Sequence, residues 1–140
     1  MVLVTAPSQA QHELMDRISQ IPWSGAGQAA LDAYPKARNL KIHDANSWAK
    51  LGLLLYDAHA YPEALEAMTE AARGDSIWRF AALVWQGHLL DLLGRRPEAL
   101  ARYQEALKIP GSPTMRHDQF HLVLNKAWVE ERLKTPFVRK

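Results

Sequence analysis

The sequence predicts a single all-α domain, and three observations support this prediction. Apolar residues recur at helical spacing, and this pattern repeats along the chain at an offset of 35 residues. No segment alternates convincingly between apolar and polar residues, so no β-sheet is expected. Proline and glycine stand where helices would begin and end. With 140 residues, 48% of them hydrophobic, the chain can bury one core without disulfides, and it contains no cysteine.

The first two helices form the weakest copy of the pattern, residues 11–44. Pro22 ends the first helix, because proline removes a backbone donor and clashes with the preceding turn. Pro35 falls inside the second helix and should kink or split it. The full set of expected helices is 8–21, 27–40, 45–58, 62–73, 76–93, 97–109 and 113–134.

The clearest internal repeat pairs residues 62–71 (PEALEAMTEA) with residues 97–106 (PEALARYQEA). The segments before them repeat in the same register, since Gly52 and Gly87 are also 35 positions apart. Small residues at these landmarks allow two antiparallel helices to approach closely, while larger residues fill the space beside the contact. Each copy is therefore expected to be a helix hairpin.

The ends of these helices carry local signals. Pro62 and Pro97 stand just inside the expected helix starts, where a missing N–H costs nothing. Gly74 and Gly94 follow the expected helix ends, because glycine accepts the left-handed conformation of a C-cap.

The last expected helix, residues 113–134, begins at Ser112 and Pro113 and ends before Pro136. Its apolar residues fall on two nearly opposite stripes of the helical wheel. One stripe is expected to pack on the preceding hairpin. The second must be covered either within this chain or by a second copy, and it consists of Met115, Leu122, Val129 and Leu133.

The repeated segments resemble the tetratricopeptide repeat, which has about 34 residues and the pattern W-x2-L-G-x2-Y, then A-x3-F and A. The matching residues are Trp48, Leu51, Gly52, Leu55, Ala64, Met68 and Ala71, then Leu83, Gly87, Leu90, Ala99, Tyr103, Ala106 and Pro110. The sequence departs from the pattern at Leu55 and Leu90, which replace tyrosine, and at Gln86, which replaces leucine. The resemblance implies a short right-handed superhelical stack over residues 1–140, with a degenerate repeat at 11–44, repeats at 45–78 and 80–111, and a capping helix at 113–134.

The resemblance also implies a concave groove lined by the first helix of each repeat. The implied positions are Asn46, Ala49, Lys50, Leu53, Tyr56, Asp57, Ala81, Val84, Trp85, His88, Asp91 and Leu92, with His12, Met15, Asp16 and Ser19 from the degenerate copy. Aromatic residues beside a few polar groups are typical of binding hot spots. The groove is expected either to bind a partner or to pack on the C-terminal helix.

Some members of this family hold a partner's C-terminal carboxylate with lysine and asparagine side chains. The corresponding positions here are Met15, Ser19, Leu53, Val84 and His88, so that clamp is not expected. The sequence favours a non-catalytic scaffold that binds an apolar peptide or helix segment. The alternative is a structural module that forms a homodimer through its C-terminal helix.

Other chemistry has weaker support in the sequence. His88 and Asp91 are three positions apart on a helix, but no nucleophile accompanies them, so no enzyme is expected. His117 and His121 could chelate a metal from one helical face, but no third ligand is identifiable. We therefore expect neither a metal site nor a cofactor.

The net charge of +2 is small for a protein that binds nucleic acid, so no nucleic-acid partner is expected. The apolar runs are shorter than the roughly 18 residues of a membrane span. The N-terminal residues lack a secretory pattern, so a cytoplasmic location is expected.

Overall fold

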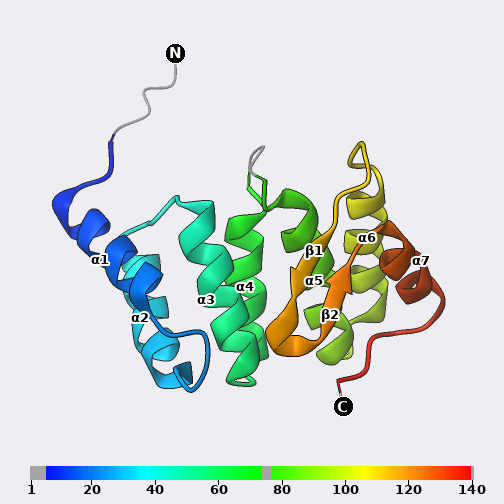
Figure 1. Cartoon of the computed structure of the whole chain (residues 1–140), viewed down its shortest axis with the longest axis horizontal. Coiled ribbons are helices and arrows are strands. Elements are labelled where there is room, and N and C mark those ends of the chain that lie inside the picture. Colours follow the sequence, from blue (N-terminus) through cyan, green and yellow to red (C-terminus); the bar gives the residue numbers. More distant parts are fainter. Residues whose placement is uncertain (1–5, 74–76, 140) are drawn as a thin grey trace.

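The computed structural model describes residues 6–73 and 77–139, and this part of the chain is mostly helical, as predicted. Within these residues the chain forms seven α-helices, one 3₁₀ helix and one two-stranded β-hairpin, which are joined by loops (Figure 1). In chain order the elements are α1 (Gln9–Gln20), α2 (Gly27–Asn39), α3 (Ala45–Asp57), α4 (Tyr61–Ala71), α5 (Arg79–Leu92), α6 (Arg96–Leu107), β1 (Met115–His117), η1 (Asp118–Phe120), β2 (Leu122–Leu124) and α7 (Lys126–Lys134).

The helix boundaries follow from local chemistry. Ser8 caps α1 through a capping box with Gln11, and Asp44 caps α3 by accepting a hydrogen bond from the Ser47 backbone N–H. Prolines stand in the first turn of α4 and α6, as predicted. Helix α2 runs through Pro35 without a break, so the predicted split does not occur. Pro35 lacks the N–H that would bond to the carbonyl of residue 31, and both residues lie on the exposed face of α2.

Helices α3 and α4 pack as one hairpin, and α5 and α6 as another. The close contacts expected at the glycines are present. A Cβ placed on Gly52 would lie 2.7 Å from the Met68 Cε, and one placed on Gly87 would collide with the Tyr103 ring. Ala64 is fully buried, as is its counterpart 35 positions later, Ala99. The repeated register thus produces the same helix contact twice.

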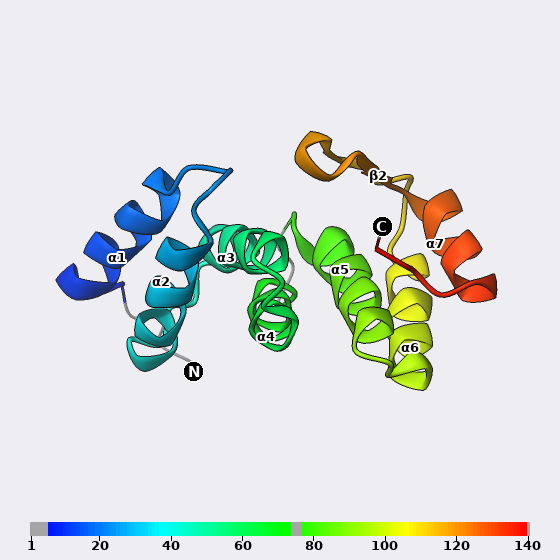
Figure 2. The ribbon, with the colours of Figure 1, turned by 90° about the horizontal axis from the view of Figure 1, so that it is seen from below.

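The helices form a row in which consecutive elements are neighbours. Figure 2 shows α1, α3 and α5 along one side of the row and α2, α4 and α6 along the other. The hairpin β1–β2 and α7 stand at the far end of the row, and the hairpin rises on the same side as α1. A continuous cluster of buried apolar side chains runs from Leu14 in α1 to Val129 in α7. None of the helices in the described residues combines the length and apolar character needed to cross a bilayer.

The predictions of one helix at residues 113–134 and of no β-sheet are both wrong. Residues 115–124 form an antiparallel hairpin in which Met115 pairs with Leu124 and His117 pairs with Leu122. His121 closes the turn after η1 in the left-handed conformation, with φ 55°. Asn125 then caps α7 by accepting a hydrogen bond of 2.8 Å from the backbone N–H of Trp128.

The hairpin has a physical advantage over the expected helix. As a helix, this segment would present apolar side chains on two opposite sides. In the hairpin, His117 and Leu124 are buried, whereas Arg116 and Val123 point outward and are exposed. The strands therefore direct most of the apolar side chains of residues 115–124 toward the helices, on one face of the hairpin. A single helix could not do this.

Candidate functional site

The groove residues implied by the two regular repeats lie on α3 and α5, and those implied by the degenerate copy lie on α1. The structure gives the residues on α3 and α5 different environments. Asn46 and Lys50, in the first half of α3, border a surface pocket. Asp57 is exposed at the end of α3, and Asp91 and Leu92 are half-buried at the end of α5. Three of the remaining members, Tyr56, Trp85 and His88, are buried against the chain's own C-terminal segment. The others are also buried, namely Ala49, Leu53, Ala81 and Val84.

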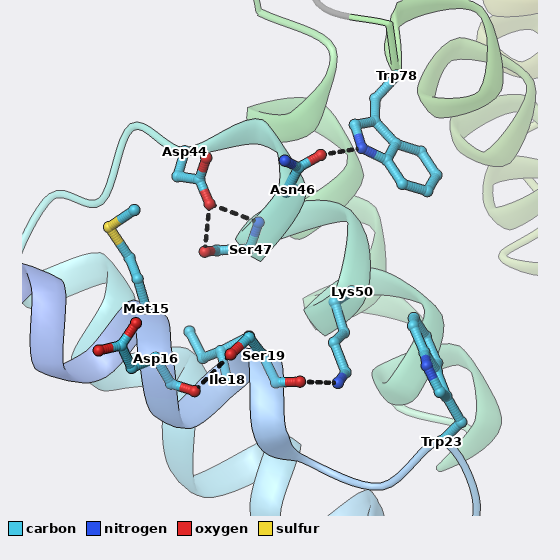
Figure 3. Close-up of a pocket in the computed structure, with 10 residues that line it drawn as sticks. All are labelled: Met15, Asp16, Ile18, Ser19, Trp23, Asp44, Asn46, Ser47, Lys50 and Trp78. Atoms are coloured by element: carbon cyan, nitrogen blue, oxygen red, sulfur yellow. Dashed lines mark hydrogen bonds between the residues drawn. The ribbon is translucent and has the colours of Figure 1, made fainter.

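The surface pocket, which we call the N-terminal pocket, has a volume of about 460 Å³ (Figure 3). Helix α1, the loop after it, the start of α3 and the residue before α5 build its wall. The residues that line it are Met15, Asp16, Ile18, Ser19, Trp23, Asp44, Asn46, Ser47, Lys50 and Trp78. The degenerate copy therefore contributes three of its implied groove residues, Met15, Asp16 and Ser19.

Lys50 is the cation of the N-terminal pocket. Its Nζ donates a hydrogen bond of 2.8 Å to the Ser19 carbonyl and lies 4.7 Å from the centre of the Trp23 ring. Partial burial lowers the pKa of Lys50. An ammonium has three N–H donors, so the bond to Ser19 leaves donors for a ligand carbonyl or carboxylate.

Two other polar side chains of the pocket, Asn46 and Asp44, form hydrogen bonds with neighbouring residues. The Asn46 side-chain oxygen accepts a hydrogen bond from the Trp78 indole, which turns the amide nitrogen of Asn46 away from Trp78 (Figure 3). Asp44 accepts from both the Ser47 backbone N–H and the Ser47 hydroxyl, at 3.0 and 2.6 Å. The Oδ2 atom of Asp44 therefore caps α3.

The hairpin covers the centre of α5. Trp85 is completely buried, and its indole nitrogen donates a hydrogen bond of 3.2 Å to His117 Nε2. The Phe120 ring lies 5.0 Å from the Tyr56 ring and 5.8 Å from the Trp85 ring, centroid to centroid. Burial lowers the pKa of His117, which keeps it neutral as an acceptor for the indole. The expectation that Trp85 faces an open groove is therefore wrong.

His88 and Asp91 do not form a dyad. His88 Nε2 lies 3.0 Å from the Tyr56 hydroxyl, and burial together with Arg139 and Arg132 lowers the pKa of His88 well below 6.5. The Asp91 carboxylate instead forms an ion pair with Arg96, at 3.0 Å. Asp91 also accepts hydrogen bonds from the Tyr103 hydroxyl and the backbone N–H of residue 137. These contacts connect the end of α5 to α6 and to the C-terminal tail.

The second apolar stripe is covered within one chain. Val129 is fully buried in α7, and the other three residues are partly buried against the core: Met115, Leu122 and Leu133. The dimer was suggested because a second copy could cover this stripe, but the structure covers it within one chain. The imidazoles of His117 and His121 do not share a helical face, because one lies in β1 and the other in the turn after η1. Over residues 6–73 and 77–139, no three potential metal ligands of the His, Asp or Glu type cluster together.

Sequence reasoning missed two groups of residues. The first is Trp23, which is 48% exposed in the loop that follows Pro22. An exposed tryptophan beside a serine- and glycine-containing loop is a signal that could have drawn attention to it. The second group is Phe137 and Arg139, which contact α5 and α3. No local pattern predicts contacts between residues so far apart in the chain.

No family model matches this chain, and no curated protein or solved structure is significantly similar to it. The function must therefore be inferred from the geometry of the site.

Proposed function

We propose that this chain is a non-catalytic protein-interaction module built from tetratricopeptide-like helix pairs in a right-handed stack, and that it binds a protein segment in the N-terminal pocket. The observation that carries the proposal is a surface pocket of about 460 Å³ with two tryptophan side chains and an ammonium in its wall. Tryptophan side chains beside a positioned polar group are typical of binding hot spots.

The repeat assignment is supported by the equivalent contacts of the two hairpins. Gly52 meets Met68, and Gly87 meets Tyr103, 35 positions further along in both helices. Stacked helix pairs of this kind commonly present one face to ligands. Here the α1 and α3 part of that face remains accessible.

The lining of the N-terminal pocket indicates the chemistry of the ligand. Met15, Trp23 and Trp78 offer apolar surface, and Lys50 offers an N–H donor with a positive charge. A segment that presents a large apolar side chain, together with a carbonyl or carboxylate group, complements these residues. Such a segment matches the apolar peptide or helix expected from the sequence, but its site is the N-terminal pocket rather than the centre of α5.

Selection of peptides from a random library on the full chain tests this proposal. For the selected peptides, Trp23→Ala should weaken binding by about 2 kcal/mol, or roughly thirtyfold, because an interfacial tryptophan is truncated. Titration calorimetry measures the change, with circular dichroism as the check on folding. Leu31→Ala is the matched control, since Leu31 is an exposed apolar residue on α2, outside the pocket.

Two results would contradict the proposal. One is that no peptide is enriched on the folded protein. The other is that the enriched peptides bind with equal affinity to the wild type, Trp23→Ala and a Lys50→Ala variant.

A further inference from the structure

The C-terminal tail, residues 135–139, lies across α5 and α3 as an extended segment. Thr135 ends α7 with extended backbone angles, φ −134° and ψ 125°, as expected for a residue before proline. Figure 2 shows the tail turning back from α7 toward the space between the hairpin and α5. Its residues alternate in exposure, since Phe137 and Arg139 are half-buried whereas Val138 is 69% exposed.

Phe137 occupies an aromatic slot. Its ring centroid lies 3.5 Å from the His88 ring and 6.0 Å from the Trp128 ring. Its backbone N–H donates a hydrogen bond of 3.1 Å to the Asp91 carboxylate. The slot therefore recognises both an aromatic side chain and the backbone that carries it.

Arg139 occupies a second position, at the C-terminal end of α3. Its guanidinium carbon lies 4.1 Å from the Tyr56 ring centre. Its Nη1 donates to the Tyr56 carbonyl at 2.8 Å and to the Tyr61 hydroxyl at 3.1 Å. The last carbonyls of a helix carry partial negative charge, so this position favours a cation.

The occupied site has features of a ligand complex rather than of a sealed core. The two anchoring side chains are only half-buried. His88 Nδ1 is buried without a hydrogen-bond partner among the described residues. This nitrogen stays unpaired whichever segment of this chemistry fills the slot, so displacement of the tail rests on the partial exposure of its two anchors.

We propose that this surface is a peptide-recognition site for an extended segment in which an aromatic residue stands two positions before an arginine, and that the tail is its resident intramolecular ligand. An external segment of this chemistry binds after it displaces the tail. The tail is tethered next to the site and so acts at a high effective concentration, which weakens the apparent affinity for external segments. The site is separate from the N-terminal pocket, and the proposal does not depend on that pocket.

The test uses the peptide acetyl-TPFVRK, labelled with a fluorophore at its N-terminus, and the full chain. In the double variant Phe137→Ala, Arg139→Ala, the tail keeps its length but loses both anchors. Fluorescence anisotropy should show that this variant binds the peptide at least tenfold more tightly than the wild type. Val138→Ala is the matched control and should bind as the wild type does, because Val138 faces outward.

The competing outcomes are distinct. Equal affinity for the double variant and the wild type would overturn the proposal, as would equal binding of the peptide TPAVAK. If the double variant does not fold, hydrogen exchange in the wild type decides. A millimolar concentration of unlabelled acetyl-TPFVRK should then accelerate exchange at the Phe137 amide, and no acceleration would overturn the proposal.

Discussion

Two positions 35 residues apart, Lys50 and Trp85, show how the two halves of the α1, α3 and α5 face differ. Both occupy the same register of their helix pair. Lys50 lies at the N-terminal pocket, held by Ser19 and Trp23. Trp85 is completely buried beneath the hairpin and bonded to His117.

The difference teaches that equivalent positions in a repeat take their role from the segment that packs over them. Over α5, the hairpin and the tail supply apolar and aromatic cover, so a tryptophan there belongs to the core. Over the first half of α3, the neighbour is α1 with its following loop, and the pocket stays accessible. An accessible pocket and a buried core thus occupy the two ends of one surface.

Among the variants that test this comparison, replacement of Trp85 should change the free energy of unfolding most. Trp85→Ala should reduce the free energy of unfolding by about 3–5 kcal/mol, because it leaves a large cavity under the hairpin. Lys50→Ala, at the equivalent position, should change it by less than about 1 kcal/mol. Urea denaturation measures both. If the two variants have similar stability, the contrast between a filled and an accessible half is wrong.

A smaller effect is expected at the ion pair that fastens the C-terminal segment. Arg96 contacts the buried Asp91 carboxylate and also donates to the carbonyls of Arg132 and Leu133 at the end of α7. Arg96→Ala should cost about 2–3 kcal/mol, because it removes the cation from a buried carboxylate and the donor from two carbonyls at the end of α7, although partial exposure of Arg96 moderates the loss.

The neighbouring residue provides the control for this experiment. Arg95 pairs with Glu98, and both side chains are exposed. Arg95→Ala should therefore change the free energy of unfolding by less than about 1 kcal/mol in the same urea titration. A loss at Arg95 as large as that at Arg96 would show that the C-terminal segment is not fastened as described.

The smallest expected effect is the dependence of stability on pH. His88 is held neutral in the folded state, with its pKa lowered well below 6.5 by burial and by the facing cations Arg139 and Arg132. The unfolded chain binds a proton near pH 6.5, so this stabilisation is complete above that pH and is lost as the pH falls below it. Between pH 7.5 and 5.5, His88 should account for a loss of about 1 kcal/mol.

Urea titrations at several pH values measure this slope, and His88→Gln should reduce it. The other groups near His88 are the Tyr56 hydroxyl, His117, and the rings of Trp85, Trp128 and Phe137. His117 also has a lowered pKa and should leave a residual slope. An unchanged slope in the His88→Gln variant would show that protonation of His88 does not oppose folding.

Most of the helical body could be predicted from local patterns. The starts of α4 and α6 follow from Pro62 and Pro97, and the close helix contacts follow from Gly52 and Gly87. These features depend on residues within a turn or two, or on a repeat that marks the same contact twice. The helix predicted at residues 115–124 does not form. Each strand there has three residues, which is too short for a clear alternation of apolar and polar residues in the sequence.

The candidate site was predicted only in part. Asn46 and Lys50 lie at an accessible pocket, whereas Trp85 and His88 lie beneath other parts of the chain. The cover comes from Phe120 and Phe137, which follow the end of α5 at Leu92 by 28 and 45 residues. Their contacts depend on how the hairpin and tail fold back.

The amino-acid pattern was thus sufficient for the helices, their ends and their pairing, because hydrogen bonding within a turn and small-residue spacing are local properties. Which face of α3 and α5 meets solvent depended on the final packing of the C-terminal segment. Burial is a property of all the surfaces that meet at a point, and no single segment of the chain encodes it.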